Sequence, residues 1–140
     1  MRTILFVCTG NTCRSPMAAC MMNALCKKQK YAEVCALSAG LRTTNDAPAS
    51  EGARLAMEKR GLSLAEHHAQ PVTQRLLRDV SLVVGMSQAH IAAIKKLYPS
   101  VTVPMRAFAP PIPDPYGCDP GVYEQAAQAM EKQLESLLSP

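Results

Sequence analysis

Hydrophobic and polar residues along this chain alternate in blocks that predict strands followed by helices. Residues 3–8 are almost all apolar, which is typical of a central strand buried on both faces. Ser15 is a good N-cap and Pro16 fits the first turn of a helix, so a helix is predicted from there to about Lys28. A buried strand therefore passes through a short loop into a helix near the start of the chain.

The same alternation continues along the rest of the sequence. Further strands are predicted at 33–38, 80–86 and 101–104, and further helices at 48–60, 73–78, 87–97 and 121–138. Ser87 is predicted to cap the helix after it, and the proline-rich segment 109–115 can continue neither a helix nor a central strand. The pattern predicts an α/β fold: a single doubly wound domain over residues 1–140, with a four-stranded parallel sheet flanked by helices on both faces. Such folds bind ligands beyond the carboxyl ends of the strands.

Composition narrows the class of protein. The chain has 140 residues, of which 48% are hydrophobic, with six cysteines and a net charge of +4. No apolar run approaches the roughly 18 residues of a membrane span, and the run after Arg2 is shorter than the hydrophobic region of an export signal. We therefore expect a cytoplasmic protein with reduced cysteines. We also expect it to be a monomer. The mild positive charge favours anionic substrates but is too small and scattered to indicate nucleic-acid binding.

Reactive residues cluster in the loop after the first strand, Cys8-Thr9-Gly10-Asn11-Thr12-Cys13-Arg14-Ser15, which we call the thiol loop. Cys8 is a candidate nucleophile, because a helix N-terminus, a guanidinium and a hydrogen bond from Ser15 all favour a thiolate. Arg14 offers a planar fork to two phosphoryl oxygens, and the backbone N–H groups can hold the remaining charge. The loop therefore predicts a cradle for inorganic phosphate or another oxyanion, with a nucleophile at its base.

Two further residues are expected to shape the thiol loop. Gly10 is expected to supply a backbone angle that most residues resist, and the Asn11 side chain to brace the loop. A cysteine and an arginine at this spacing also occur by chance, and a cysteine at a strand end is commonly only a small buried residue. The buried strand before the loop and the Ser-Pro helix start after it favour the catalytic interpretation.

An enzyme that forms phosphocysteine also needs a carboxyl group, first to protonate the leaving group and then to activate water. The aspartate candidates are Asp46, Asp79, Asp114 and Asp119, and the glutamates are further candidates. Asp114 is favoured because it lies between Pro113 and Pro115 in a stiff loop, followed by Tyr116. On its own an Asp-Pro step is an ordinary turn, and the thiol loop is what favours a catalytic acid here.

Several motifs, in the same order along the chain, resemble the low-molecular-weight protein tyrosine phosphatase family. They are the run from Ile4 to Ala18, Ser38-Ala39-Gly40, the segment of His67, Ala69, Pro71, Val72 and Thr73, and Asp114-Pro115-Tyr116. The resemblance implies Cys8 as the nucleophile, Arg14 as the phosphate ligand and Asp114 as the general acid and then the base. It implies no cofactor and no metal ion.

The resemblance also implies a set of substrate-binding residues and a network of residues that support the loop. The expected substrate-binding residues are Thr9, Gly10, Asn11, Thr12, Cys13, Arg14, Ser15 and Tyr116. The expected support network consists of Asn11, Ser15, Ser38 and His67. Taken alone, His67 beside His68 would be typical of a solvated loop histidine, or of a metal pair that lacks a third ligand.

Three departures from the tyrosine-specific pattern of the family concern the substrate. Thr12 stands where a branched aliphatic residue is usual, Gly117 where a second aromatic residue is frequent, and Leu41–Asp46 contains no aromatic residue. Each change removes apolar wall from a slot for a phenyl ring. Together with Gly85-Met86-Ser87 followed by His90, they resemble the protein arginine phosphatase branch. The predicted activity is therefore hydrolysis of phosphoarginine in phosphorylated proteins.

Other interpretations remain open at this point. The nearest is the same fold acting on phosphotyrosine. Arsenate reduction would need a relay of further cysteines, whereas Cys20, Cys26 and Cys35 are typical of packing positions and Cys118 of a loop. An anion-binding regulator would lack the nucleophile or the acid. Cys13 shares the tight loop with Cys8, so a reversible Cys8–Cys13 disulfide that protects the nucleophile is also predicted.

Overall fold

The predicted parallel sheet is present. Its strands are β1 (Arg2–Cys8), β2 (Val34–Gly40), β3 (Leu82–Gly85) and β4 (Met105–Ala107). The computed structural model describes residues 2–31, 33–43 and 46–138. The four strands lie in the order β2-β1-β3-β4, and each neighbouring pair is parallel. β1 therefore has a neighbour on each side, as its continuous apolar run predicts.

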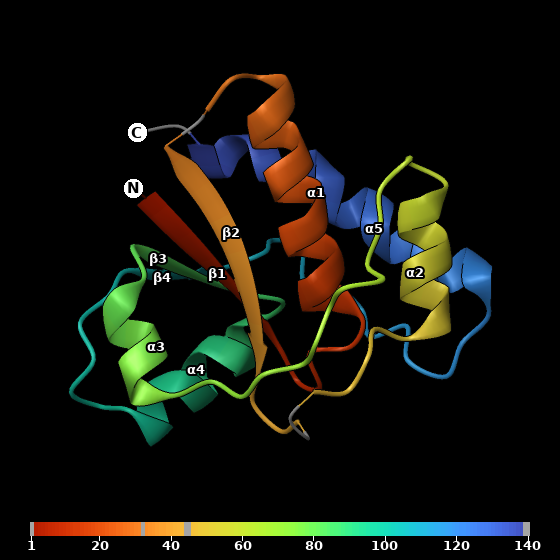
Figure 1. Ribbon diagram of the computed structural model, residues 1–140. Helices are drawn as coiled ribbons and strands as arrows, with labels where there is room; N and C mark the ends of the chain where they lie inside the picture. The colour runs from red at the N-terminus through yellow and green to blue at the C-terminus, as the bar shows by residue number, and fades with distance from the viewer. Residues whose placement is uncertain (1, 32, 44–45, 139–140) are drawn as a thin grey trace.

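Helices cover both faces of this sheet (Figure 1). They are α1 (Arg14–Lys28), α2 (Glu51–Glu58), α3 (Gln74–Asp79), α4 (Gln88–Leu97) and α5 (Pro120–Leu134), which a 3₁₀ turn (Glu135–Leu138) follows. α1, α2 and α5 pack together on one face, and α3 and α4 lie on the other. The predicted α/β architecture, with helices on both faces of a four-stranded parallel sheet, is confirmed.

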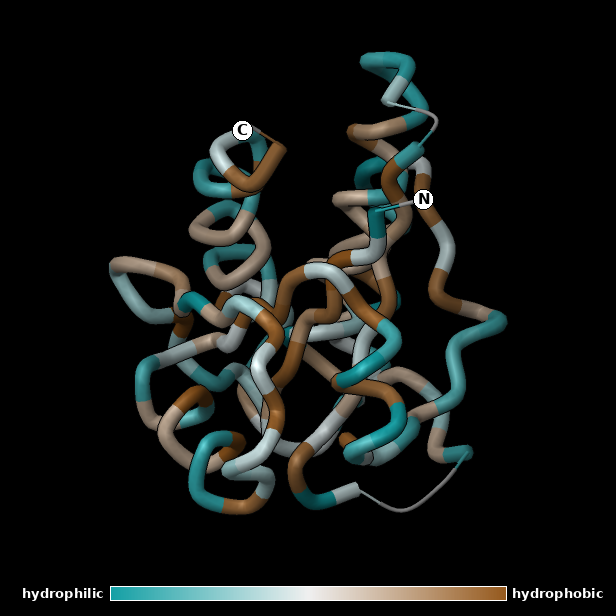
Figure 2. The backbone as a smooth tube through the Cα atoms, turned by 90° about the vertical axis from the view of Figure 1, so that its left-hand side faces the viewer, coloured by the Kyte–Doolittle hydropathy of each residue, from teal (hydrophilic) through white to brown (hydrophobic). Residues whose placement is uncertain are grey.

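Alternate residues of β1 serve the two cores. Ile4 and Phe6 join the core under α1, α2 and α5, whereas Leu5 and Val7 join the core under α3 and α4. All four are 0% exposed, and burying each such side chain contributes about 1.5–3 kcal/mol to stability. In Figure 2 brown segments run through the middle of the molecule, and many of the outer loops are hydrophilic. β1 is thus a rigid base for the residues that follow it.

The fourth strand lies later in the chain than the apolar run at 101–104 predicts. β4 covers Met105–Ala107, while Val101 and Val103 pack, partly buried, against the core under α3 and α4. A backbone N–H of β3 donates to the Pro104 carbonyl at 2.9 Å, and the strand starts only after this proline, which has no N–H of its own. The prediction is wrong because pairing with β3, and not local hydropathy, positions this short edge strand.

Several helix ends also differ from the prediction. α1 begins at Arg14 with Cys13 at the N-cap position, so Ser15 lies inside the first turn and is not the cap. α2 begins at Glu51, three residues later than predicted, because Ser50 caps it by accepting the Ala53 N–H at 3.4 Å. The helix predicted to reach residue 138 ends at Leu134 and continues as the 3₁₀ turn. Among the described residues, no helix has the length and apolar character needed to cross a membrane.

The winding of the sheet reverses at β1. α1 leads from β1 to β2 on one side, and β3 adds to β1 on the other side, so the segments that leave β1 and β3 diverge at the carboxyl edge of the sheet. The thiol loop begins at this edge.

Candidate active site

Cys8 is the last residue of β1 and pairs with Gly40 of β2, and it is only 2% exposed. Its Sγ atom lies 2.8 Å from Ser15 Oγ and accepts the Asn11 backbone N–H at 3.3 Å. The Asn11 amide donates to Ser15 Oγ at 2.8 Å, so the single Ser15 hydroxyl proton is available either to the sulfur or to the Ala39 carbonyl, which lies 3.5 Å away. Both contacts fix the position of the sulfur at the base of the loop.

Asn11, and not Gly10, has the unusual backbone angle in the thiol loop. The φ of Asn11 is +57°, whereas Gly10 lies outside the left-handed region, so the expectation for Gly10 is wrong. Asparagine tolerates this region because its short amide can bond to nearby groups. Here the amide donates to Ser15 and accepts the Gln70 backbone N–H at 2.9 Å. The Asn11 side chain therefore braces the loop from two directions.

The segment after α2 supports Asn11 from behind. His67 Nε2 donates to the Asn11 carbonyl at 2.7 Å, which assigns the ring proton to Nε2. Burial lowers the pKa of His67, and the bond to Asn11 opposes this effect. The Gln70 side chain donates to the Ser38 carbonyl at 2.9 Å, so buried Ser38 is linked to the loop through Gln70.

The end of β2 approaches the thiol loop very closely at Gly40. A Cβ atom at this position would lie 2.8 Å from the Thr9 carbonyl oxygen and 3.0 Å from the Asn11 nitrogen. Immediately afterwards, the Leu41 N–H donates to the Cys8 carbonyl at 3.0 Å and the Arg42 N–H to the Thr9 carbonyl at 2.8 Å. A glycine is needed here because backbone packs against backbone.

Arg14 and Asp114 face each other beside the thiol. The Arg14 side chain is 7% exposed, its Nη1 donates to the Ile112 carbonyl at 3.0 Å, and its Nη2 lies 3.7 Å from Asp114 Oδ2. The Asp114 side chain is 53% exposed, and its other oxygen accepts the Tyr116 backbone N–H at 3.1 Å. The Ile112 carbonyl therefore fixes the guanidinium group of Arg14. The carboxyl group of Asp114 stays at the boundary with solvent, where it can exchange protons.

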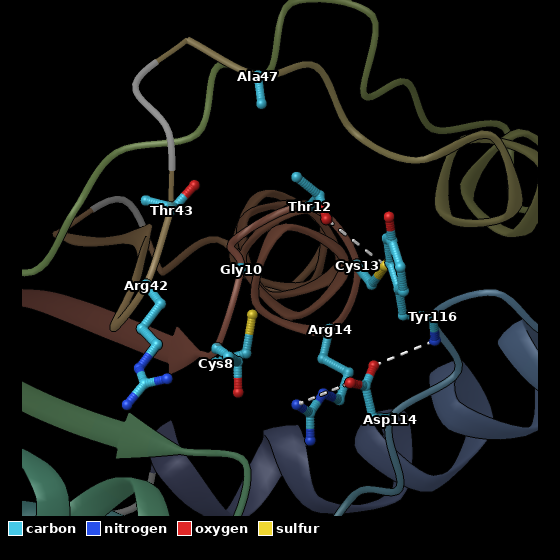
Figure 3. Close-up of a pocket in the computed structure, with 11 residues that line it drawn as sticks. Cys8, Gly10, Thr12, Cys13, Arg14, Arg42, Thr43, Ala47, Asp114 and Tyr116 are labelled. Carbon is cyan, nitrogen blue, oxygen red and sulfur yellow. Dashed lines mark hydrogen bonds and ion pairs between the residues drawn. The ribbon is translucent and has the colours of Figure 1, made fainter.

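These groups surround a hollow of about 310 Å³ (Figure 3). The residues that line it are Cys8, Thr9, Gly10, Thr12, Cys13, Arg14, Arg42, Thr43, Ala47, Asp114 and Tyr116. Of the expected substrate-binding residues, Asn11 and Ser15 are 0% exposed and support the loop from behind instead of lining the hollow. Tyr116 is 70% exposed at the rim. Positions 44 and 45, within the segment predicted to lack an aromatic wall, lie outside the described residues.

The other candidate aspartates lie elsewhere. Asp119 caps α5 by accepting the Val122 N–H at 3.3 Å, Asp79 ends α3, and Asp46 is exposed. Of these four described carboxyl groups, Asp114 is the one that lines the hollow.

A second histidine supports Thr9. His90 Nε2 lies 3.1 Å from Thr9 Oγ1, and its Nδ1 lies 2.7 Å from Ser87 Oγ. Ser87 does occupy the N-cap position of α4, but its hydroxyl bonds to His90 and not to the helix backbone, so that part of the prediction is wrong. Burial lowers the pKa of His90, Arg14 adds to this effect, and Asp114 opposes it.

The Cys13 thiol contacts Ser50, which caps α2, and Tyr123, which lies in α5. Its Sγ lies 3.2 Å from Ser50 Oγ and 3.5 Å from the Tyr123 hydroxyl, and both Cys8 and Cys13 are free thiols. Burial raises the pKa of Tyr123. The Cys8–Cys13 disulfide stays a prediction.

Some residues of the site carry little signal in the sequence. Gln70 holds Asn11 through its backbone N–H, which almost any residue could supply. Arg42 lines the hollow but follows the Ser-Ala-Gly motif without a pattern of its own. The sequence does indicate the contact between Ser87 and His90, because these residues are one helical turn apart at a helix start, where side chains meet.

A thiol, a guanidinium and a carboxyl group around one hollow are the groups that a cysteine-dependent phosphatase needs. Residues 3–140 match the model of the low molecular weight phosphotyrosine protein phosphatase family. The probable low molecular weight protein-tyrosine-phosphatase AmsI of Erwinia amylovora is 33% identical to this chain, over 96% of this chain and 94% of its own length. The protein-arginine-phosphatase of Geobacillus stearothermophilus is 31% identical, over 96% of this chain and 92% of its own length.

A solved structure supports the same conclusion. A mutant of the arginine phosphatase YwlE with a phosphorylated active-site serine has a TM-score of 0.91 and 27% identity, over 96% of this chain and 92% of that chain. This chain therefore belongs to the low molecular weight phosphotyrosine protein phosphatase family. It is a cysteine-dependent phosphatase that acts on phosphorylated proteins.

Proposed function

We propose that the protein removes the phosphoryl group from phosphoarginine in proteins. The observation that carries this proposal is the wall of the hollow, where Thr12, Thr43 and Ala47 stand instead of large apolar side chains. A phenyl ring gains most from apolar and aromatic contacts, whereas a guanidine group makes hydrogen bonds that the Thr12 hydroxyl can accept or donate. The similarity to the protein-arginine-phosphatase of Geobacillus stearothermophilus supports the same substrate.

The reaction proceeds in two steps. The Cys8 thiolate attacks phosphorus as the bond from phosphorus to the guanidine nitrogen breaks, and Asp114 gives its proton to that nitrogen. Arg14 and the backbone N–H groups of the thiol loop hold the phosphoryl oxygens. Water then attacks phosphocysteine, Asp114 takes a proton from the water, and inorganic phosphate leaves as the thiolate is restored. The phosphorylated active-site serine of the YwlE mutant supports a covalent route.

Phosphotyrosine is the second candidate substrate, and one observation favours it. The Tyr116 ring is 70% exposed at the rim of the hollow, where it can stack on a phenyl ring. The similarity to AmsI supports this substrate as well. Arsenate reduction has no such support: of the six cysteines, all of which the structure describes, Cys8 and Cys13 alone line the hollow.

A paired assay decides between the two substrates. Peptides that are identical except for phosphoarginine or phosphotyrosine are compared by kcat/KM, and the proposal expects a preference for phosphoarginine. A large preference for phosphotyrosine contradicts it. Phosphate release from both peptides should be abolished in Cys8→Ser, which confirms that the release comes from this site. A parallel assay with arsenate and thioredoxin tests the reductase.

Thr12→Ile tests the wall of the hollow directly. Replacing the hydroxyl with a branched apolar chain should shift the ratio of the two kcat/KM values toward phosphotyrosine by about tenfold. Thr12→Ser is the matched control, because it keeps the hydroxyl and should keep the preference. An unchanged ratio in Thr12→Ile would remove Thr12 from the explanation of specificity.

A further inference from the structure

Arg42 is a cation at the mouth of the active site that the two reaction steps do not use. Its backbone is fixed, because its N–H donates to the Thr9 carbonyl at 2.8 Å, but its side chain is exposed. Among the described residues it takes part in no ion pair with an acidic side chain. In Figure 3 the Arg42 side chain lies on one side of Cys8, and Arg14, Asp114 and Tyr116 lie on the other.

A second hollow adjoins the active site on the side of Arg42. It has a volume of about 360 Å³ and is lined by Thr9, Leu41, Arg42, Ala89, His90 and Ala93. Thr9 and Arg42 line both hollows, so the two hollows adjoin at these residues. Leu41, Ala89 and Ala93 give the second hollow its apolar lining, and Arg42 is its permanently charged residue.

The His90 ring in this hollow is already engaged. Its two nitrogens contact Thr9 and Ser87, and burial lowers its pKa, so it adds no fixed positive charge near neutral pH. The charge that the second hollow presents to a ligand is therefore that of Arg42. An apolar trough with one cation at its edge fits a side chain that has an aliphatic stem and a carboxylate end.

We propose that Arg42 determines specificity by binding a glutamate side chain of the substrate protein, located within a few residues of the phosphorylated residue. The phosphorylated side chain enters the first hollow, the stem of the glutamate lies against Leu41, Ala89 and Ala93, and its carboxylate pairs with Arg42. The inference rests on the phosphatase activity of the family and holds for either phosphorylated residue. The thiol loop contacts only the phosphorylated side chain, whereas Arg42 would recognise the neighbouring glutamate of the substrate sequence.

The test uses peptides with one phosphorylated residue and neutral flanks, in which Glu, Gln or Lys is placed at each flanking position in turn. For the wild-type protein, Glu at the best position should raise kcat/KM about two- to fivefold over Gln, the range of an exposed ion pair. The preference should shrink when NaCl is raised from about 0.05 M to about 0.5 M, because salt screens exposed charges. The preference should vanish in Arg42→Gln, persist in Arg42→Lys and turn toward Lys in Arg42→Glu.

Arg75→Gln is the matched control, because Arg75 is an exposed arginine of α3 that lines neither hollow. It removes the same charge and should keep the wild-type preference for Glu. The inference is overturned if the wild-type protein shows no preference for Glu at any position, or if Arg42→Gln keeps it. Both a phosphoarginine and a phosphotyrosine series are measured, so that a failure of phosphoarginine turnover overturns the proposed function alone and leaves the Arg42 comparison to be made on phosphotyrosine.

Discussion

Gly40 leaves no room for a methyl group between β2 and the thiol loop. In Gly40→Ala the added Cβ would lie 2.8 Å from the Thr9 carbonyl oxygen, so the loop or the strand must move. We expect unfolding free energy to fall by about 1–3 kcal/mol. We expect kcat/KM to fall on the order of 10- to 100-fold, because the nucleophile and the oxyanion donors lose their alignment. Chemical denaturation and a phosphatase assay measure the two effects.

Gly10→Ala is the control for this prediction. The nearest atom to a Cβ at Gly10 is Thr12 Oγ1 at 3.7 Å, an ordinary contact. Its unfolding free energy should change by less than about 0.5 kcal/mol. Equal destabilisation by the two substitutions would contradict the argument from close approach.

The half-buried ring of His67 should make stability depend on pH. Burial lowers the pKa of His67, so the unfolded chain binds a proton there more readily than the folded protein does. The contribution is therefore present above the ordinary histidine pKa of about 6.5 and is lost as the pH falls below it. Unfolding free energy measured by denaturant titration should fall between about pH 7.5 and about pH 5.

His67→Gln should flatten this slope while keeping a donor for the Asn11 carbonyl. His90 contributes in the same direction, because burial also lowers its pKa, so part of the slope should remain. His68→Gln removes the exposed neighbour, whose charge contributes only a minor part of the lowered pKa of His67, and should keep most of the wild-type slope. A slope that is the same in all three proteins would contradict the role given to His67.

At the level of single residues, chemistry was easier to predict than conformation. Cys8, Arg14 and Asp114 do meet around one hollow, because reactive residue types at fixed spacing next to a strand end limit where they can lie. The left-handed angle fell on Asn11 and not on Gly10, because either residue tolerates it and the partners of Asn11 come from a distant segment. Contacts of that kind have no local signal in a sequence.

Among the helices, α2 and α5 are joined by an ion-pair cluster. Arg60, just after α2, donates to both carboxylate oxygens of Glu124 at 2.8 and 2.9 Å and to Glu131 at 3.0 Å. The Arg60 and Glu124 side chains are only 16% and 23% exposed. These bonds raise the pKa of Arg60, and they lower the pKa of Glu124. The cluster holds α2 against the helix that carries Tyr123.

Arg60→Gln should therefore lower the unfolding free energy by about 1–2 kcal/mol, since it leaves two carboxylates near each other without their cation. Arg54→Gln on the exposed side of α2 removes the same charge outside the cluster, and should change stability by less than about 0.5 kcal/mol. Thermal or chemical denaturation of the two variants gives the comparison. A similar loss of unfolding free energy in Arg60→Gln and Arg54→Gln would contradict the role of the cluster, and would indicate that removing any positive charge from this region destabilises the protein.

Element types were predictable from hydropathy, and element ends were not. β1 and α1 carry strong signals, and their positions agree with the prediction to within one or two residues. β4 lies later than its hydropathy predicts, because a strand of three residues at the sheet edge takes its register from β3. The Ser15 hydroxyl suits an N-cap, whereas in the protein this hydroxyl contacts the Cys8 sulfur and the Asn11 amide.

For the whole molecule, the two cores share one sheet. Ile4 and Phe6 belong to one core, and Leu5 and Val7 to the other, so loss of β1 would disrupt both cores. We propose that residues 1–140 form one cooperative domain. Unfolding followed by far-ultraviolet circular dichroism and by tyrosine fluorescence should give coincident transitions. Two separated transitions would show that the faces unfold independently.

The depth of Cys8 sets a minimum length for the substrate side chain. The thiol is 2% exposed at the base of its hollow, so a polypeptide that rests on the rim must reach down to it. Arginine and tyrosine carry a phosphoryl group at the end of a long side chain, whereas in serine and threonine the phosphorylated oxygen is attached directly to Cβ. The short side chains would stop above the sulfur. We therefore expect phosphoserine and phosphothreonine peptides to be poor substrates because of their reach, before any polar contact distinguishes a guanidine from a phenol.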